Sequence, residues 1–205
     1  MIEYDNFIII LSSPSGAGKS TITKELLEWD KNIQVSVSAT TRQPRDGEID
    51  GVHYHFFTKE EFEKEIEANN FVEHAKVFDN YYGTLKREVE SKFADKHDII
   101  FDIDWQGARQ VSDVYDGKKL LKIFILPPSI AELEQRLKSR GKDSEEVIKN
   151  RMDRAQQEIE HFNEYDYVVV NDNMDKALNQ IKSIIITKKL ANVKQGALEN
   201  FVKNL

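Results

Sequence analysis

The hydrophobic residues of the chain fall into two alternating patterns. Short apolar runs rich in β-branched residues, typical of strands buried on both faces of a parallel sheet, cover residues 7–11, 33–37, 99–103, 121–126 and 167–170. Between them, apolar residues recur every three or four positions, as in amphipathic helices, around residues 22–27, 130–137, 147–159 and 178–185. This alternation predicts an α/β fold, with a parallel five-stranded sheet flanked by helices on both faces.

Two segments interrupt the alternation. Residues 38–90 are too long for a simple crossover and are rich in aromatic and polar residues, so they predict an inserted subdomain. The charged segment 138–146 contains a glycine and joins two helical patterns; it suits either a mobile lid or a plain exposed turn between helices. We expect a core of residues 1–37, 91–136 and 152–205, an insertion of residues 38–90, and a lid of residues 137–151.

A loop with two glycines follows the first apolar run directly. Gly16 and Gly18 let backbone N–H groups converge on an anion, and the start of a helix adds positive potential. Lys19 can reach the outer phosphates of a nucleotide, and the Ser20 hydroxyl can ligate Mg²⁺. Ser13 stands where this type of loop usually has its first glycine, and an ordinary strand-to-helix turn is the alternative interpretation. The loop predicts a site for ATP or GTP, formed by Ser15, Gly16, Ala17, Gly18, Lys19, Ser20 and Thr21.

Composition and charge narrow the class of protein. A chain of 205 residues suffices for one α/β domain with appendages. Its 29 basic and 36 acidic residues give a net charge of −7, which argues against general nucleic-acid binding. The absence of cysteine excludes disulfides and thiolate metal sites. The first residues lack a basic segment, and the apolar run after them is too short for a membrane span. We therefore expect a cytoplasmic protein without nucleic-acid or membrane partners.

Three further motifs accompany the phosphate loop. They comprise residues 36–48 with 51–54, residues 71–75 with 80–84, and residues 99–107. With these motifs the sequence resembles the guanylate kinases from about residue 7 to residue 190. The resemblance implies a P-loop nucleoside-monophosphate kinase fold in which the insertion binds GMP and the lid closes over the phosphates. It also implies Mg²⁺-dependent transfer of the γ-phosphoryl group of ATP to GMP.

Arginines and tyrosines in the insertion suit the phosphate of GMP. Arg42 and Arg45 flank Pro44, planar guanidinium groups bind phosphate in bidentate fashion, and the hydroxyls of Tyr54 and Tyr82 can donate hydrogen bonds. The resemblance adds Ser38 to this set. The alternative is that both arginines are solvated charges on a proline-bearing loop. A phosphate oxygen of GMP is already anionic near neutral pH, so the reaction needs positioning and charge neutralisation rather than a catalytic base.

An acidic residue is the expected reader of the guanine base. Guanine presents N1–H and its exocyclic amino group as adjacent donors, which the Glu73 carboxylate can accept, whereas adenine presents an acceptor there. Thr84 can hydrogen-bond guanine O6, and Asp104 can accept from the amino group. Without the surrounding motif, Glu73 would be taken for an ordinary solvated glutamate.

Asp102 closes an apolar run and resembles the family's acidic residue that organises Mg²⁺, directly or through water, together with Ser20. Asp102 and Asp104 lie two apart, so on a strand both would face the same way. Ligands of open α/β sheets bind at that end of the strands, and on the resemblance both aspartates also belong to the GMP site. The alternative is that they only cap the strand and the following turn.

Further basic residues are candidates for the lid. Arg136 and Arg140 lie four apart on one helical face, and Arg151 falls on the next helix. Converging on the phosphates, they would neutralise charge and exclude water, so Arg136 and Arg151 join Lys19 and Arg42 as expected catalytic residues. Glu132 precedes Arg136 by four residues, which is also a common spacing for a surface ion pair.

Asn171 ends the last apolar run, where the resemblance implies a contact with the adenine of ATP. The signal is modest, because a strand that ends in Asn-Asp is also an ordinary turn or helix N-cap. Arg136 and Arg140 complete the expected ATP-binding set.

Two other functions remain open at this point. A non-catalytic domain of the same fold could bind phosphorylated proteins, but it would have little reason to keep Lys19, Ser20 and Asp102. A kinase of another small phosphorylated acceptor is disfavoured by Glu73 and Thr84. The expected partners are ATP and GMP, with dGMP possible, and the chain could be a monomer or a homodimer.

Overall fold

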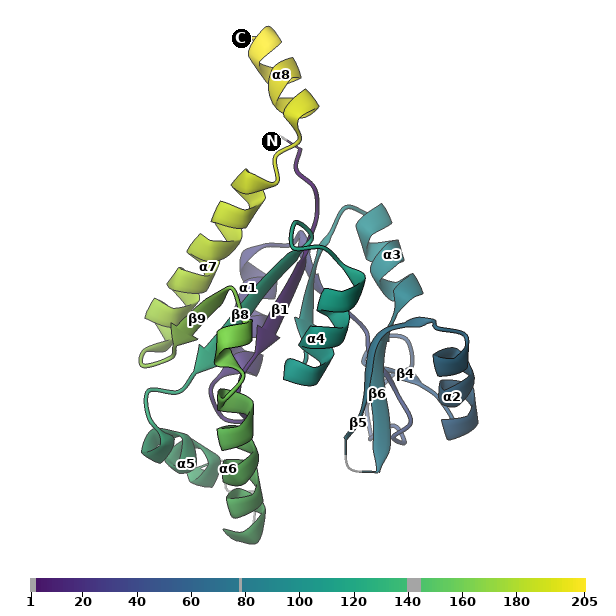
Figure 1. Ribbon diagram of the computed structural model, residues 1–205, viewed down its shortest axis with the longest axis vertical. Helices are drawn as coiled ribbons and strands as arrows, with labels where there is room; N and C mark the ends of the chain where they lie inside the picture. The colour runs from purple at the N-terminus through teal and green to yellow at the C-terminus, as the bar shows by residue number, and fades with distance from the viewer. Residues whose placement is uncertain (1–2, 78, 140–144) are drawn as a thin grey trace.

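The computed structural model describes residues 3–77, 79–139 and 145–205, and its centre is a five-stranded parallel sheet (Figure 1). The strand order is β2 (Ile33–Val35), β7 (Asp98–Asp102), β1 (Ile8–Ser12), β8 (Leu120–Leu126) and β9 (Tyr167–Val170). Each strand coincides, within two residues at either end, with one of the apolar runs. The predicted five-stranded parallel sheet is therefore confirmed.

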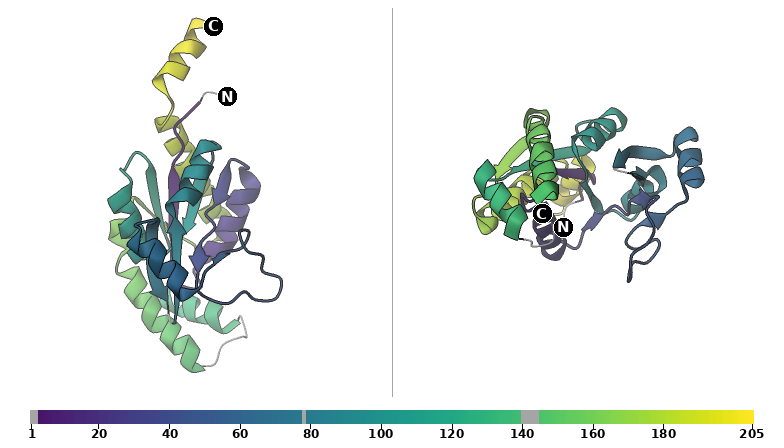
Figure 2. Two further views of the ribbon diagram at one scale, coloured as in Figure 1. Left: turned by 90° about the vertical axis from the view of Figure 1, so that its right-hand side faces the viewer. Right: turned by 90° about the horizontal axis from the view of Figure 1, so that it is seen from below.

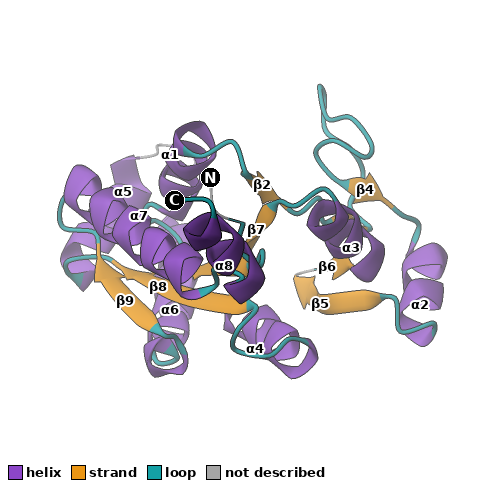
Figure 3. Cartoon of the chain, turned by 90° about the horizontal axis from the view of Figure 1, so that it is seen from above, coloured by secondary structure: helices purple, strands orange, loops and turns teal. Residues whose placement is uncertain are grey.

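Side chains of the central strand alternate between two hydrophobic clusters. Ile9 and Leu11 pack with α1 (Lys19–Trp29) and α7 (Met174–Ala191), whereas Ile8 and Ile10 pack with α3 (Lys86–Ala94) and α4 (Trp105–Val114). The four apolar side chains of β1 are fully buried, as expected for a strand covered on both faces. The view along the sheet in Figure 3 shows α1 and α7 on one side of it and α4 on the other.

A second, smaller sheet lies beside the first. Its order is β4 (His55–Phe56), β3 (Ala39–Thr40), β6 (Asn80–Leu85) and β5 (Phe71–Val77), and α2 (Lys59–Glu67) packs on it. The fully buried ring of Phe62 on α2 stacks against Phe71 at 4.4 Å between centroids and against Tyr81 at 5.4 Å. This sheet, with its own small core, falls within the predicted insertion and stands apart from the main sheet in Figures 1 and 2.

The two ends of the molecule carry different helices. α5 (Ile130–Ser139) and the start of α6 (Glu145–Ile159) lie at one end, and α8 (Gln195–Lys203) projects at the opposite end (Figure 2). The 3₁₀ turn η1 (Phe162–Glu164) follows α6 and leads into β9. Residues 140–144 of the predicted lid, including Arg140, lie outside the described residues. None of the helices that the structure describes is long and apolar enough to cross a membrane.

A buried charge network fastens the amino-terminal edge of the main sheet. The Asp98 carboxylate, which is fully buried, accepts hydrogen bonds from the Tyr4 hydroxyl at 2.8 Å and from the Asn6 side chain and the Phe7 N–H at 3.2 Å each. Lys189 of α7 pairs with Asp98 at 3.1 Å and with Asp30 at 2.5 Å. The network ties both ends of the chain to the start of β7.

Candidate active site

The loop between β1 and α1 is shaped by two glycines in the left-handed region. Gly16 has φ 98° and Gly18 has φ 103°, values that side-chain-bearing residues rarely adopt. Gly18 is the N-cap residue of α1, so the N–H groups of the first helical turn, which includes Ser20 and Thr21, point toward this loop. A Cβ atom on Gly18 would lie 2.5 Å from Nδ2 of Asn171. Space as well as backbone geometry therefore requires glycine here.

The predicted nucleotide lysine and metal carboxylate meet directly. Lys19 Nζ forms an ion pair with Asp102 Oδ1, and the two side chains are 19% and 39% exposed. Their positions follow from the parallel pairing of β1 with β7, which sets Leu11 beside Asp102. Because both groups reach solvent, an entering anion can take the place of Asp102 as the partner of Lys19.

Asn171 lies behind the loop and braces it. Its side chain is 2% exposed and donates from Nδ2 to the Ala17 carbonyl oxygen at 2.8 Å. The Asn171 carbonyl accepts from Arg136 at 3.3 Å, and Arg136 also binds Glu132 at 3.0 Å, the i,i+4 pair noted as an alternative in the sequence. The structure thus brings Asn171 and Arg136 to the phosphate loop. A contact of Asn171 with adenine stays a prediction.

Glu158 on α6 is a site residue that the sequence analysis missed. Burial raises the pKa of its carboxyl group, although the charge of Lys19 and the backbone N–H of Ser15 lie near it and favour the ionised form. Oε2 of Glu158 is buried without a hydrogen-bond partner among the described residues. A signal existed, because Glu158 falls three residues after the buried Ala155, on the apolar face of its helix.

Arg151 lies on the same helix, one turn before Ala155. It lines a cavity of about 580 Å³ along α6, together with Val147, Asn150 and Arg154 among others. The structure therefore carries the predicted lid arginine on the helix that also supplies Glu158.

Directly after β3 of the second sheet, the Arg42 guanidinium is held in place by neighbouring side chains. Its guanidinium binds both carboxylate oxygens of Glu48, at 3.0 and 2.9 Å, and lies 5.3 Å from the centroid of the Tyr54 ring. Tyr82 packs edge-on against Tyr54. The hydrogen bond from Arg42 lowers the pKa of Glu48 to about 2. Glu48 was not among the predicted site residues, although it belongs to the motif.

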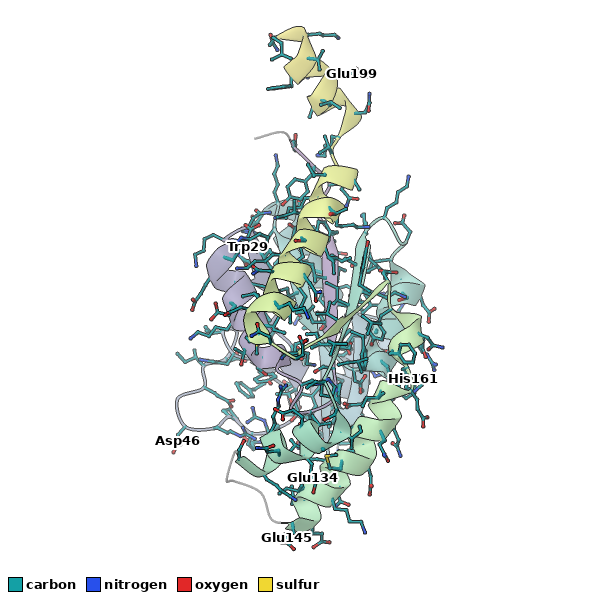
Figure 4. All side chains as sticks on the ribbon, turned by 90° about the vertical axis from the view of Figure 1, so that its left-hand side faces the viewer. Trp29, Asp46, Glu134, Glu145, His161 and Glu199 are labelled. Atoms are coloured by element: carbon teal, nitrogen blue, oxygen red, sulfur yellow. The ribbon has the colours of Figure 1, made fainter. Side chains whose placement is uncertain are left out.

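The other residues predicted to bind the phosphate of GMP lie around the Arg42–Glu48 pair. The backbone N–H of Arg45 donates to Glu48 at 2.7 Å, while the Arg45 residue itself is exposed. Ser38 accepts at its carbonyl from the His55 N–H at 2.9 Å. Figure 4 labels Asp46, which lies at the tip of the loop that carries Arg45. The arginine loop is therefore open to solvent at its tip and held at its base by Glu48.

Glu73 on β5 is a buried carboxylate, contrary to what an isolated surface glutamate would show. It is 5% exposed and accepts a hydrogen bond from the Thr84 hydroxyl at 2.8 Å across the strand pair. Burial, helped by the nearby charge of Asp104, raises the pKa of Glu73 to about 7. A Cβ on Gly107 would come within 3.2 Å of Glu73 Oε2, so the first turn of α4 approaches the carboxylate closely because it has glycine there.

Asp104 lies near both Glu73 and Glu158, and it is a helix cap rather than a strand residue. β7 ends at Asp102, and Asp104 is the N-cap of α4, where its Oδ1 accepts from the N–H groups of Gln106 and Gly107 at 2.9 and 3.0 Å. The expectation that both aspartates face one way along a strand is therefore wrong. The capping alternative holds for Asp104, whose charge also raises the pKa of both Glu73 and Glu158.

Comparison with known proteins finds close relatives of this chain. The family model described as guanylate kinase matches residues 6–188. A guanylate kinase of Cereibacter sphaeroides is 52% identical over 97% of this chain and 94% of its own length, and one of Rickettsia bellii is 52% identical over 92% and 98%. The crystal structure of guanylate kinase from Anaplasma phagocytophilum superposes with a TM-score of 0.75 at 32% identity, covering 99% of this chain and 96% of that one.

Proposed function

The chain belongs to the guanylate kinase family, and we propose that its residues divide the family's reaction between two facing sites. In this reaction the γ-phosphoryl group of ATP is transferred to GMP, giving ADP and GDP. The observation that carries the proposal is the pairing of a phosphate loop, with Lys19 and Asp102 in contact, and a buried carboxylate, Glu73, on a separate sheet. The first binds the donor and the second selects the acceptor.

On the donor side, the loop N–H groups and Lys19 bind the phosphates of ATP. Lys19 exchanges Asp102 for phosphate oxygens, a low-cost exchange because the ion pair is partly exposed. Asn171 keeps the loop in shape through the Ala17 carbonyl, and we propose that it also contacts the adenine. The loop therefore needs little reordering when ATP enters.

Mg²⁺ fits the oxygen donors beside the loop. Ser20 supplies a hydroxyl and Asp102 a carboxylate, and Mg²⁺ characteristically takes one or two protein oxygens together with phosphate oxygens and water. We propose that Ser20 and Asp102 hold it, with Asp102 acting directly or through water. When bound, the ion neutralises charge on the transferring phosphoryl group.

On the acceptor side, the phosphate of GMP meets Arg42, Arg45, Tyr54 and Tyr82, with Ser38 beside them. Glu48 holds the Arg42 guanidinium in a bidentate pair, which orients it before GMP binds. A phosphate oxygen of GMP, with a second pKa of about 6, is itself the nucleophile. No residue of the chain has to remove a proton from it.

The guanine base is read by Glu73. Its ionised carboxylate accepts from N1–H and the exocyclic amino group, and Asp104 contributes a second acceptor for the amino group. Thr84 donates to Glu73 in the structure, so a contact with guanine O6 requires the hydroxyl to turn from Glu73 to the base. We propose that this turn accompanies binding.

Closure completes the site. Arg136, Arg140 and Arg151 converge on the phosphates when the lid (residues 137–151) and the insertion (residues 38–90) move against the core. Arg136 has to leave Glu132 for this role, which is an exchange between weak, partly exposed partners. Solution scattering with and without both nucleotides tests closure, and an unchanged radius of gyration would refute it.

A coupled assay of ADP release tests the function itself. GMP should support rapid turnover, dGMP should be accepted to some degree, and AMP, CMP and UMP should be poor acceptors. Turnover without preference for GMP would contradict the role of Glu73. No turnover with any acceptor would support a binding domain instead. The remaining expectations are a cytoplasmic location, no nucleic-acid or membrane partner, and a monomer or homodimer.

A further inference from the structure

Strand β5, which carries Glu73, is an edge strand of the second sheet. One row of its backbone N–H and C=O groups therefore lacks a strand partner. The side chain of Gln110 on α4, which lies beside β5 (Figure 3), takes both groups at His74, the residue after Glu73. The His74 N–H donates to Gln110 Oε1 at 3.0 Å, and Gln110 Nε2 donates to the His74 carbonyl oxygen at 2.9 Å. A single amide pairs with the strand edge as a neighbouring strand would.

These two hydrogen bonds fix the strand in a direction that the apolar contacts leave free. Val72 of β5 is buried in the same hydrophobic cluster as Ala108 and Val111 of α4. Such burial is non-directional, so it holds the strand against the helix but permits sliding. Hydrogen bonds have preferred lengths and angles, so the amide pair sets the position of His74 along α4.

The same face of α4 also meets the Glu73 carboxylate. Gly107 precedes Gln110 by three residues, which places the two on one face of the helix. A Cβ atom at Gly107 would lie 3.2 Å from Glu73 Oε2, and Asp104, the N-cap of α4, adds a negative charge near Glu73. The position of His74 on α4 therefore determines where the Glu73 carboxylate stands relative to this helix.

The other side of α4 is anchored to the core. Trp105 stacks on His161 with 3.7 Å between ring centroids, and Arg109 donates to both carboxylate oxygens of Glu164 in η1, at 2.7 and 2.6 Å. Trp105 and Arg109 lie four residues apart and so share a face of the helix. Because α4 is held independently of the second sheet, it provides a fixed reference for β5.

We propose that Gln110 is a positioning residue for guanine selection, because its pairing with His74 holds the Glu73 carboxylate where it meets the donors of the base. The inference rests on the proposed role of Glu73 as the reader of guanine. In this role Gln110 touches no substrate and acts through the backbone of β5. Without the amide pair β5 can slide along α4, and even a small displacement of a binding group weakens both binding and discrimination.

Gln110→Met tests this role, because methionine keeps the approximate size of the side chain and removes both hydrogen bonds. We expect KM for GMP to rise about tenfold, with kcat and KM for ATP within about twofold of wild type, and the preference for GMP over AMP to fall. Gln110→Asn, whose amide is one methylene too short to reach both groups of His74, should behave the same way.

Gln34→Met is the matched control for both variants. Gln34 is also a half-buried glutamine, and it lies on β2, an edge strand of the main sheet. Its amide likewise has two side-chain partners, His97 at 3.0 Å and Lys92 at 3.2 Å. The control therefore removes the same number of hydrogen bonds at a place remote from Glu73, and KM for GMP should stay at the wild-type value.

Two further measurements separate positioning from a general loss of structure. In a Glu73→Gln background, Gln110→Met should cause little further loss of kcat/KM for GMP, since the carboxylate through which it acts is already gone. Relative to Glu73→Gln, the pH below which KM for GMP rises should move down in Gln110→Met. The reason is that water reaches Glu73 and lowers its pKa, while Asp104, whose charge faces Glu73 from α4, is unchanged.

The outcomes are distinguishable from those that test the reaction. A wild-type KM for GMP in both Gln110 variants would overturn the inference, as would an equal loss with and without the Glu73 carboxylate or the same rise in KM with Gln34→Met. If instead Glu73→Gln itself leaves the kinetics with GMP unchanged, the proposed role of Glu73 fails, and the inference about Gln110 fails with it.

Discussion

Two buried carboxylates at different places in the fold are treated in opposite ways. Asp98, at the amino-terminal edge of the main sheet, is fully buried and has four partners: a hydroxyl, an amide, a backbone N–H and the Lys189 ammonium. Glu73, in the second sheet, is 5% exposed and has the Thr84 hydroxyl as its side-chain partner. A buried charge costs free energy unless it is paired and hydrogen-bonded. Asp98 meets that requirement within the chain, whereas Glu73 has room for further donors, which on the proposed function are those of guanine.

The charged groups at the two ends of the strands of the main sheet differ in the same way: at one end they are paired within the chain, and at the other they remain available to a ligand. At the amino-terminal edge, charges hold the two ends of the chain to β7. At the carboxyl-terminal edge, Lys19, Asp102 and Glu158 have partners that a nucleotide can replace or disturb. Removal of a charge should therefore damage the fold at the first edge and the reaction at the second.

Lys19→Ala should give the largest effect. We expect kcat to fall about 10³-fold or more, because the main cation on the donor phosphates is lost. GMP binding should remain, and the free energy of unfolding should change by less than about 1 kcal/mol, since the Lys19–Asp102 pair is partly exposed. Lys24→Ala on the same helix, which removes an exposed pair with Glu28, is the control. A large loss of stability in Lys19→Ala would break the contrast between the edges.

Asp98→Asn should lower the stability of the protein and leave its catalysis unchanged, the opposite of Lys19→Ala. Breaking a buried charge network by removing one partner costs about 3 kcal/mol in unfolding free energy, while KM for both substrates should stay unchanged. Urea denaturation measures the loss. Asp172→Asn, which breaks an exposed pair with Lys176, should cost less than about 1 kcal/mol. Equal losses in the two variants would mean that the Asp98 network contributes no more than a surface pair.

Glu73→Gln should lower kcat/KM for GMP about 10²-fold, because an amide offers one acceptor where guanine presents two donors. Unlike Asp98→Asn, it should leave the protein as stable or more stable, since it removes a buried charge. Kinetics with GMP and AMP, together with urea denaturation, measure both effects. Wild-type kinetics with GMP would exclude Glu73 from the site.

The pH dependence of GMP binding sharpens the comparison further. With the pKa of Glu73 near 7, the carboxyl group protonates as the pH falls below 7 and loses its acceptor role, so KM for GMP should rise by up to about tenfold per pH unit. The phosphate of GMP titrates in the same region, and Glu73→Gln isolates that contribution. An identical pH profile for both proteins would contradict the raised pKa.

The raised pKa of Glu73 also determines how the free energy of unfolding depends on pH. The folded-state pKa of Glu73 lies above its usual 4.5, so the folded protein binds this proton more tightly than the unfolded chain. The stabilisation is complete below pH 4.5 and is lost as the pH rises toward 7. GMP should restore stability at the higher pH, because it supplies donors to the ionised carboxylate.

Glu158 should give the smallest effect, in opposite directions for two variants. Glu158→Gln keeps an acceptor for the Ser15 N–H but removes a negative charge near the phosphates, so KM for ATP should fall about two- to threefold. Glu158→Ala also removes the acceptor and should raise KM for ATP. Glu160→Gln, at an exposed position, is the control. A lower KM for ATP in both Glu158 variants would show that only the charge matters. A higher KM in both would show that the amide cannot replace the carboxylate as acceptor.

The sequence predicted the fold where local pattern decides it. Five apolar runs became the five strands, because strands buried on both faces have to be apolar throughout. The glycines of the loop were recognisable, since their backbone requirement is local. Asp104 was placed wrongly because strand periodicity was extended past the residue where β7 ends, into a helix cap.

The site was less predictable where partners are distant in sequence. Glu158 meets Ser15 from 143 positions away, and Asn171 meets Ala17 from 154 positions away. The burial of Glu73 depends on α4 as well as on its own strand pair, so its raised pKa could not be read from its neighbours in the chain. Glu48 is different: it lies within the motif, but a carboxylate was not expected among groups that bind phosphate.

The contact between Asn171 and the phosphate loop limits how the loop can vary. With the amide of Asn171 pressed against Gly18, even one added methyl group would push the two segments apart, and a shorter side chain in place of Asn171 would leave the Ala17 carbonyl without its donor. Neither position can therefore change without the other. A designer who wishes to alter nucleotide preference should keep this pair and work on the residues around it.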